Sequence, residues 1–441
     1  MIDSKIKLIK SEEFRSKYRD SSNEKETKYG LKSDISFCTK CVNSNQVPVS
    51  AIEFKHNIES VKKGVEFDGK NVCDACKFAE IKNKIIDWDI REKELIDLCD
   101  KHRKNDGNYD CIVPGSGGKD SFYQAHILKY KYGMHPLTIT WAPHLYTEWG
   151  RSNFDKWLGA GFDNYNVTPN PRVHRLLTRL AVENLFHPFQ PFILGQKGLA
   201  PKIASMMNIG LIFYGENEAE YHNSIADNTS AKRDWSYFSE SNPDDIYLGG
   251  TSIKKLTNDF GLEKIDLDMY LPINPQVLEE KNIEVHYLGY YLPWHPQGAY
   301  YYAVEHGGFS PSPERTAGTY SKYNSIDDKI DDFHYYTTYI KFGIGRATYD
   351  AAQEIRNNEI DRDEAISLVK KYDGEYPSRF EKEVFEYLSI NKEEFPIASK
   401  MFECPTMDKE NFNALCDYFK SPHIWRLNEN DQWKLINAIW Y

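Results

Sequence analysis

The order of segments between residues 109 and 141 constrains the fold more than any other feature of the chain. Residues 109–113 are apolar enough for a buried strand, a glycine-rich turn follows, residues 121–132 have the pattern of a helix, and residues 137–141 form a second apolar run. Two parallel strands need a crossover connection of this kind. The order therefore predicts a βαβ unit.

The same alternation continues along the chain. Further strands are predicted near residues 163–167, 211–214 and 284–288, with helices over residues 172–183 and 199–207. Strands separated by helices are typical of a mostly parallel, doubly wound sheet. The sequence therefore predicts an α/β fold.

Four of the eight cysteines form two Cys-x-x-Cys pairs, Cys38 with Cys41 and Cys73 with Cys76. Two such knuckles supply the four thiolates of a tetrahedral structural Zn²⁺ site. An iron–sulfur cluster and four reduced, buried cysteines are the alternatives, and His56 is a spare candidate ligand. We expect a closed zinc site, which leaves no open coordination position for chemistry.

The turn after the first predicted strand reads Pro-Gly-Ser-Gly-Gly-Lys-Asp-Ser over residues 114–121. Glycines let the backbone approach an anion, and the start of a helix presents unpaired N–H groups. The turn is not a Walker A loop, because Asp120 follows Lys119 and Val113 stands where that motif begins with glycine. A phosphate site is expected, and a simple tight connection is the alternative.

Residues 116–121, Ser-Gly-Gly-Lys-Asp-Ser, resemble the signature of the PP-loop ATP pyrophosphatases. The resemblance implies a HUP-like five-stranded parallel sheet and a loop that holds the β,γ-pyrophosphate of ATP. A substrate oxygen then attacks the α-phosphate. It also implies roles for individual residues: Ser116, Gly117, Gly118 and Ser121 bind pyrophosphate, Asp120 holds Mg²⁺, Lys119 and Asp120 serve catalysis, and Thr140 and Trp141 lie beside the adenine.

A longer resemblance covers residues 37–377 and points to the N-acetyl sugar amidotransferases of bacterial surface-polysaccharide and nonulosonic acid biosynthesis. It rests on the following stretches: residues 37–47, 73–76, 116–121, 214–218 and 294–296. These enzymes are thought to turn a sugar acetamido group into an acetamidino group with ATP and ammonia. The expected substrate is therefore an N-acetylated sugar of lipopolysaccharide or O-antigen synthesis, with AMP and pyrophosphate as products.

The source of the ammonia is expected to be another protein. Residue 2 is isoleucine, so the chain has no amino-terminal cysteine nucleophile, and no cysteine has glycines two positions before and after it. The resemblance implies separate partner subunits similar to the glutaminase and cyclase halves of imidazole glycerol phosphate synthase, which would produce and channel ammonia.

Three other groups of residues are candidates for the site. Glu216, Asn217 and Glu218 follow the fourth predicted strand, where ligands of open α/β sheets bind, and Glu216 is a catalytic candidate. The aromatic stretch at residues 287–302 suits a sugar, although core packing is the commoner role of such residues. Three arginines on one predicted helix face are expected to be solvated: Arg172, Arg175 and Arg179.

The chain is expected to divide into five parts. These are an N-terminal arm (1–36), a zinc ribbon (37–80), a helical connector (81–107), a PP-loop ATP pyrophosphatase domain (108–300) and a mainly helical C-terminal region (301–441). Within the last part, Ser378 and Glu381 have the spacing of a capping box at the start of a helix.

Composition limits the possible partners and location. The net charge of −11 disfavours nucleic acid as a partner. No apolar run reaches the length of about 18 residues that a membrane span needs, and the charged amino terminus is unlike a secretion signal. We therefore expect a cytoplasmic protein without membrane insertion. A tRNA-modifying PP-loop enzyme is one alternative, although thiolation would need a reactive cysteine near the loop and Cys111 is expected to be buried. A non-catalytic zinc-ribbon assembly subunit is the other.

Overall fold

The computed structural model describes residues 8–19, 25–216, 218–221 and 230–441. A five-stranded sheet lies at its centre, with all strands parallel and the order β3-β2-β1-β4-β7. The strands are β1 (Cys111–Pro114), β2 (Pro136–Trp141), β3 (Asn164–Val167), β4 (Leu211–Tyr214) and β7 (Glu284–Tyr287). The predicted α/β class and all five predicted strands are confirmed, each strand within two residues of its expected start.

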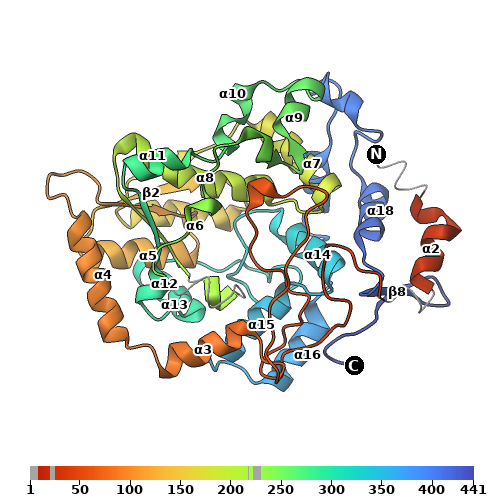
Figure 1. The fold of residues 1–441 in the computed structure, drawn as a ribbon, viewed down its shortest axis with the longest axis horizontal. Coiled ribbons are helices and arrows are strands. Elements are labelled where there is room, and N and C mark those ends of the chain that lie inside the picture. Colours follow the sequence, from red (N-terminus) through yellow and green to blue (C-terminus); the bar gives the residue numbers. More distant parts are fainter. Residues whose placement is uncertain (1–7, 20–24, 217, 222–229) are drawn as a thin grey trace.

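Helices cover both faces of this sheet (Figure 1). Ile112 of β1 belongs to the core under α7 (Pro171–Leu185) and α8 (Gln190–Met207), whereas its neighbours Cys111 and Val113 belong to the core under α5 (Lys119–Tyr130). Neighbouring strand residues point to opposite faces, so a continuous apolar run is what a strand buried on both sides requires. The remaining helices of this part are α6 (Glu148–Gly159), α9 (Ile253–Asp259), α10 (Lys264–Leu267), α11 (Pro275–Glu280), α12 (Leu288–Tyr291) and α13 (Pro296–Gly307), with a small sheet of β5 (Tyr247–Leu248) and β6 (Thr251–Ser252).

Helix α8 begins at Gln190, nine residues before the predicted start at residue 199. Its glycines lower the intrinsic helix propensity of the first half, so the sequence pattern did not predict a helix there. One of them allows close packing, because a Cβ built on Gly195 would lie 2.1 Å from Cε2 of Trp141. The Trp141 ring therefore fills the space that a larger residue would occupy, and tertiary packing outweighs local propensity.

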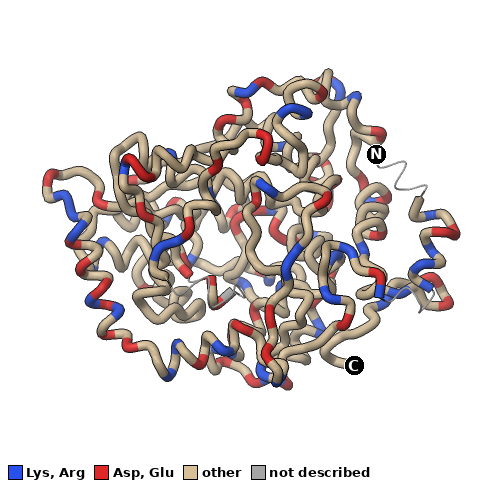
Figure 2. Tube along the Cα trace, in the orientation of Figure 1, with Lys and Arg blue, Asp and Glu red and all other residues tan. Residues whose placement is uncertain are grey.

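The connector between the cysteines and the sheet consists of α3 (Asp74–Lys84) and α4 (Trp88–His102), which run along the lower and left borders of Figure 1. Asp87 separates the two helices and caps α4, since its carboxylate accepts hydrogen bonds from the backbone N–H groups of Asp89 and Ile90, both at 3.1 Å. Basic and acidic residues are interspersed along α4, as along the rest of the chain (Figure 2).

The C-terminal region is mainly helical and ends in a hairpin. It contains α14 (Asp331–Phe342), α15 (Arg346–Arg356), α16 (Arg362–Tyr372), α17 (Glu381–Leu388), α18 (Lys409–Phe419), β8 (Trp425–Leu427) and β9 (Trp433–Leu435). The N-terminal helix α2 (Glu12–Arg19) lies beside β8 and α18 (Figure 1). The Tyr18 ring meets the Trp433 ring edge to face at 4.8 Å, and the Tyr18 hydroxyl donates to the Lys420 carbonyl at 2.8 Å. The described part of the arm is thus packed against the far end of the chain.

Two local predictions for the helices were wrong. Helix α17 begins at Glu381 rather than at Ser378, and the Glu381 carboxylate accepts from the Tyr376 hydroxyl and pairs with Lys409, so no capping box forms. Arg179 is 0% exposed instead of solvated. Its guanidinium donates to Glu183 at 2.8 Å and to the carbonyls of Leu388 and Pro405, because the C-terminal segment covers this face of α7.

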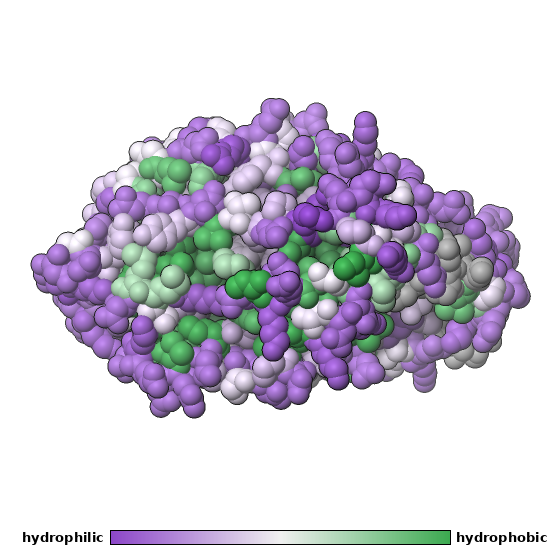
Figure 3. All heavy atoms as spheres, turned by 90° about the horizontal axis from the view of Figure 1, so that it is seen from above, coloured by the Kyte–Doolittle hydropathy of each residue, from purple (hydrophilic) through white to green (hydrophobic). Residues whose placement is uncertain are grey.

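The surface shows apolar side chains in the middle of the face seen from above, with hydrophilic side chains around them (Figure 3). Among the residues that the structure describes, no helix has the length and apolar character needed to cross a bilayer.

Candidate functional site

The site lies where the direction of the sheet connections changes. Strand β1 has β2 on one side and β4 on the other, so the connections that follow β1 and β4 leave the sheet on opposite sides of this point. Such a switch point opens a crevice beyond the carboxyl ends of the strands. The glycine-rich loop follows β1 and Glu216 follows β4, so both predicted groups meet at this crevice.

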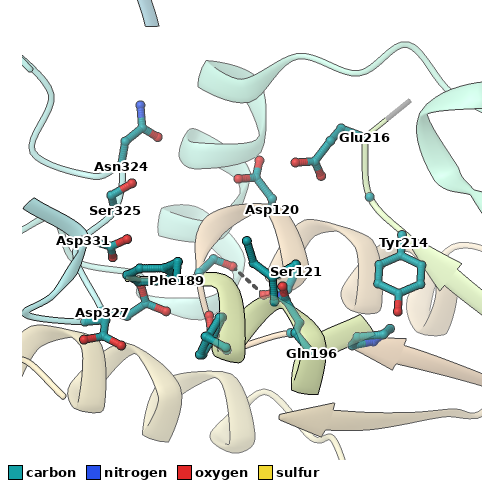
Figure 4. A pocket seen from close by; sticks show the side chains of 18 of the residues that line it. Asp120, Ser121, Phe189, Gln196, Tyr214, Glu216, Asn324, Ser325, Asp327 and Asp331 are labelled. Carbon is teal, nitrogen blue, oxygen red and sulfur yellow. Dashed lines mark hydrogen bonds between the residues drawn. The ribbon is translucent and has the colours of Figure 1, made fainter. Parts of the chain in front are cut away.

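A cavity of about 720 Å³ occupies this crevice. One wall is the loop at residues 114–121 with residues 214–216 after β4, and the other wall comes from residues 323–331 with α14 and α15. Figure 4 shows side chains of both walls pointing into the same space. The site is thus shared between the sheet and the C-terminal region.

The loop has its shape because glycines stand at its crowded positions. Gly117 adopts a φ of +86°, and a Cβ built there would lie 2.7 Å from Cα of Phe154. A Cβ on Gly115 would lie 2.3 Å from Cβ of Ser121. The chain then enters α5 at Gly118 with no side-chain cap, so the first N–H groups of the helix are left for a ligand. This arrangement suits a phosphate.

Charged side chains gather at the mouth of the loop. The Lys119 ammonium contacts both carboxylate oxygens of Asp120, at 2.8 and 2.6 Å. Burial, and secondly the charge of Asp120, raise the pKa of Glu216 to about 7. Figure 4 shows the Asp120 and Glu216 side chains on opposite sides of the same space. Asp120 offers the oxygen ligands that Mg²⁺ prefers, so the residues present suit this ion, and Glu216 with its raised pKa is left as a group that can accept a proton.

Most of the site residues expected from the sequence line this cavity. The following do: Ser116, Gly117, Gly118, Lys119, Asp120, Ser121, Glu216 and Glu218. Glu218 pairs with Arg233 and accepts from the Tyr287 hydroxyl at 2.7 Å. Asn217 lies outside the described residues.

The structure does not bring Thr140 and Trp141 to the cavity wall. The Thr140 hydroxyl accepts from the Asn164 side-chain amide at 3.0 Å, and Trp141 is 3% exposed against α8. Their expected position beside the adenine stays a prediction.

Acidic residues of the C-terminal region form the part of the site that sequence reasoning missed. Asp327 accepts a hydrogen bond from the Ser116 side chain, so it contacts the loop directly. Burial raises the pKa of Asp327. Burial also raises the pKa of Asp331 well above the usual range, and the charge of Asp327 is the second cause of that shift. Asp350 and Arg346 also line the cavity and contact each other at 2.9 Å. The only sequence signal was the pair of Asp-Asp dipeptides at residues 327–328 and 331–332.

The aromatic stretch at residues 287–302 mostly packs inside the protein. Tyr287 lines the cavity, whereas Trp294 is 1% exposed and the Tyr300 ring stacks on Tyr323 at 4.3 Å. The Tyr302 hydroxyl lies 2.8 Å from Nδ1 of His126. Core packing therefore describes this stretch better than a sugar platform.

The four cysteines of the predicted zinc site converge. Their sulfurs all lie within 4.8 Å of one another, with 3.7 Å between Cys41 and Cys73 and 3.9 Å between Cys38 and Cys76. Four sulfurs bound tetrahedrally at about 2.3 Å from Zn²⁺ would be about 3.8 Å apart. Backbone N–H groups of Lys40 and Cys73 point at the Cys38 sulfur, both at 3.4 Å, as suits a thiolate. The cluster could hold zinc, and His56 is not part of it.

This cysteine cluster supports the second wall of the cavity. The Arg362 guanidinium at the start of α16 donates to the carbonyls of Cys41 and Cys38, at 3.2 and 3.3 Å. Helix α16 in turn packs on α15, which carries Arg346 and Asp350. The cluster therefore has a structural connection to the site without taking part in it.

Comparison with known proteins agrees with this picture in part. Residues 317–439 match the family described as LPS biosynthesis protein WbpG-like, C-terminal domain. These residues include the acidic wall of the cavity. A stretch of 78 residues is 31% identical to an uncharacterized protein of Methanocaldococcus jannaschii, and it covers 18% of this chain and 27% of that protein. The family match supports a role in polysaccharide biosynthesis.

Proposed function

We propose that the chain is an ATP-dependent amidotransferase that converts the acetamido group of an N-acetylated sugar into an acetamidino group. The observation that carries this proposal is the Ser-Gly-Gly loop with Asp120 and Glu216 around one cavity at the switch point of the sheet. The loop resembles that of the PP-loop ATP pyrophosphatases, and the opposite wall belongs to the region matched by a lipopolysaccharide biosynthesis family.

The chemistry needs an activated oxygen. An amide carbonyl is a poor electrophile, so its oxygen first attacks the α-phosphate of ATP, and the bond between the α-phosphorus and pyrophosphate breaks. Ammonia then forms a bond to the carbonyl carbon, the carbon–oxygen bond breaks, and AMP leaves with the former amide oxygen. One proton must leave the new nitrogen. Glu216 is the expected acceptor, since its pKa of about 7 matches the task.

The loop residues would hold the departing pyrophosphate. The N–H groups at the start of α5 can donate to phosphate oxygens. The hydroxyls of Ser116 and Ser121 now donate to Asp327 and to the Gly118 carbonyl, and they would turn to a bound phosphate. Asp120 would hold Mg²⁺, which neutralises phosphate charge when bound. Lys119, now paired with Asp120, is placed to donate to a phosphate as well.

The acidic wall would bind the sugar. Carboxylates accept hydrogen bonds from hydroxyl groups, and Asp331 and Asp350 line the cavity together with Asp327, which contacts the loop at Ser116. Asn324 and Ser325 add polar groups on the same wall (Figure 4). A sugar held there would present its acetamido group toward Asp120 and Glu216.

The alternatives have less support. A thiolating tRNA enzyme would need a reactive cysteine at the cavity, but Cys111 is 0% exposed within β1 and burial raises its pKa well above the usual range. The described lining of the cavity includes no cysteine. A non-catalytic assembly subunit would not need a phosphate loop and two carboxylates arranged around one cavity.

The proposal is tested by incubating the protein with Mg²⁺, ATP, ammonium and a panel of N-acetylated amino sugars, free and linked to nucleoside diphosphates. Mass spectrometry should show a sugar lighter by the difference between an oxygen atom and an NH group, with AMP and pyrophosphate in equal amounts. Asp120→Asn should abolish this, whereas Asp89→Asn, an exposed acid in the first turn of α4, should not. Stoichiometric ADP, or no turnover of any sugar, would contradict the proposal.

The nitrogen donor is tested separately. We expect the isolated chain to use ammonium but not glutamine, and to use glutamine once glutaminase and cyclase-like partner subunits are added. Efficient use of glutamine by the chain alone would show that it has its own glutaminase site.

A further inference from the structure

A second cavity, of about 450 Å³, lies behind the first. Its lining includes His56, Lys62 and Lys341. The segment at residues 50–62 separates the two cavities, since Ser50, Ala51 and Glu53 line the main cavity while residues 56–62 line the second. The two cavities therefore lie on either side of a layer that includes this segment.

Four contacting titratable residues form this layer, and we call Glu53, His56, His187 and His334 the histidine partition. The Glu53 carboxylate lies 3.4 Å from Nδ1 of His56 and 3.8 Å from Nε2 of His187. The His187 ring stacks on the His334 ring at 5.0 Å, and His334 faces the main cavity. On the other side, the Lys62 ammonium lies 3.4 Å from Nδ1 of His56. The partition therefore runs from one cavity to the other.

Burial disfavours the charged form of the histidines in the partition, and two of them have an unpaired ring nitrogen. Burial lowers the pKa of His187 well below its usual range and that of His334 to about 3. Nδ1 of His187 and Nδ1 of His334 are buried and have no hydrogen-bond partner in the described structure. Burial would raise the pKa of Glu53, but Lys62 and the histidines outweigh it and hold the pKa well below the usual range. A small polar molecule would find free nitrogen atoms there.

The part of the second cavity at Lys62 and Lys341, next to the partition, disfavours protonated amines, whereas Glu13, Glu26, Glu59 and Glu183 line the rest of it. Burial lowers the pKa of Lys341 to about 7, with Lys62 as the next cause, and burial lowers that of Lys28 to about 8. An ammonium ion carries the same kind of group as these side chains. The same loss of hydration and the same neighbouring cations would favour neutral ammonia over ammonium in this space.

We propose that the second cavity receives ammonia and that the histidine partition passes it, as a neutral molecule, into the main cavity. The proton of ammonium stays with bulk water. This inference rests on the proposed function, because only a nitrogen-transferring reaction needs such a passage. It assigns to Glu53, His56, His187 and His334 a role that is separate from the phosphate loop.

Two assays separate adenylation from nitrogen transfer. Exchange of labelled pyrophosphate into ATP needs the sugar but no ammonia, whereas amidine formation needs ammonium chloride. The sugar of the panel that gives the fastest turnover is used in both. His187→Phe keeps the stacked ring and removes the nitrogens, and we expect a roughly tenfold higher KM for ammonium with unchanged exchange. His102→Phe is the matched control, since the His102 side chain is 13% exposed, close to the 12% of His187, and Nε2 of His102 lies 3.8 Å from the Glu284 carboxylate.

A second experiment blocks the second cavity without altering the partition. Val61 lines this cavity and is 74% exposed, so Val61→Cys can be labelled with a bulky maleimide. The labelled variant should lose ammonium-dependent turnover and keep pyrophosphate exchange. Val304→Cys, on α13 and 39% exposed, is labelled as the control and should keep both.

The outcomes are distinct. An unchanged KM for ammonium in His187→Phe, together with full turnover of labelled Val61→Cys, would overturn the passage while the proposed function stands. Absence of pyrophosphate exchange and of amidine formation in the unmodified protein with every sugar would contradict the proposed function, and the passage with it.

Discussion

At Glu216, burial and a neighbouring carboxylate act in the same direction. Both disfavour the charged form and raise the pKa to about 7. A base must be deprotonated to accept a proton, so we expect the rate of amidine formation to rise as the pH increases through about 7 and to level off above it. Glu216→Gln should remove this rise and lower kcat by roughly a hundredfold or more. The measurement is the pH profile of kcat at saturating ammonia.

The control for this prediction is Glu148→Gln, because Glu148 is an exposed acid in the first turn of α6. Its profile should match that of the unchanged protein. A rise through pH 7 that survives in Glu216→Gln would assign the proton acceptor to another group, such as Asp331 on the opposite wall.

At Gly195, packing leaves no room for a side chain. A methyl group there would overlap the Trp141 ring, with 2.1 Å to Cε2. Gly195→Ala should therefore lower the free energy of unfolding by about 1–3 kcal/mol, although alanine is the better helix former. Gly159→Ala is the control, because a Cβ on Gly159 in α6 meets nothing within 4 Å. Urea unfolding of both variants measures the difference, and equal stability would show that the ring can move aside.

Among the elements, the strands were the easiest to predict and the helix starts the hardest. A strand buried on both faces leaves an apolar run whatever surrounds it, so β2 and β4 follow from the sequence directly. The start of α8 depends on the Trp141 ring that fills the space at Gly195, and the start of α17 depends on partners that draw Glu381 away from Ser378. Such contacts come from distant residues and have no local pattern.

Among the elements, the cysteine cluster and α16 are joined by the hydrogen bonds of Arg362. If the cluster holds α16 through Arg362, zinc loss should loosen α15 and α16 as well as the cysteine loops. We expect one zinc per chain, which Cys73→Ser should lose. Arg362→Ala should keep the metal, yet increase amide hydrogen exchange in α16.

Metal analysis and hydrogen exchange by mass spectrometry distinguish these outcomes. Lys370→Ala, at the exposed end of the same helix, is the control and should change neither quantity. Metal-free protein with normal exchange in α16 would show that the docking does not depend on the cluster.

At the scale of the whole molecule, only one of the two walls of the candidate site could be predicted from the sequence. The loop at residues 116–121 carries its own signal, because glycine positions and a helix start are local features. The acidic wall carries only its two Asp-Asp dipeptides, which do not indicate a site by themselves, since Asp327 reaches the loop through its contact with Ser116, far away in the sequence. For the aromatic residues at 287–302 the sequence favoured core packing and left a sugar contact open, because rings that pack together look the same in a sequence as rings that bind a sugar.

Helix α2 packs against the C-terminal hairpin, so two segments far apart in the sequence are in contact. The Tyr18 ring is buried against Trp433, and its hydroxyl donates to Lys420. Tyr18→Ala should lower the free energy of unfolding by about 3–5 kcal/mol, as for a buried aromatic side chain. Lys10→Ala is the control, because the Lys10 side chain is 65% exposed. Urea unfolding monitors both, and a loss below 1 kcal/mol would mean that α2 contributes little to stability.

The contact between α2 and the C-terminal hairpin has a consequence for biosynthesis. Phe14 and Tyr18 are translated long before Trp433, which belongs to the surface that buries them. Until that surface has been made, these two rings are without their partner and are open to chaperones or to neighbouring nascent chains. The acidic wall likewise follows the phosphate loop by some two hundred residues, so a nascent chain carries the loop before it has a complete pocket. Synthesis of the C-terminal region is therefore the step that both buries these rings and completes the site.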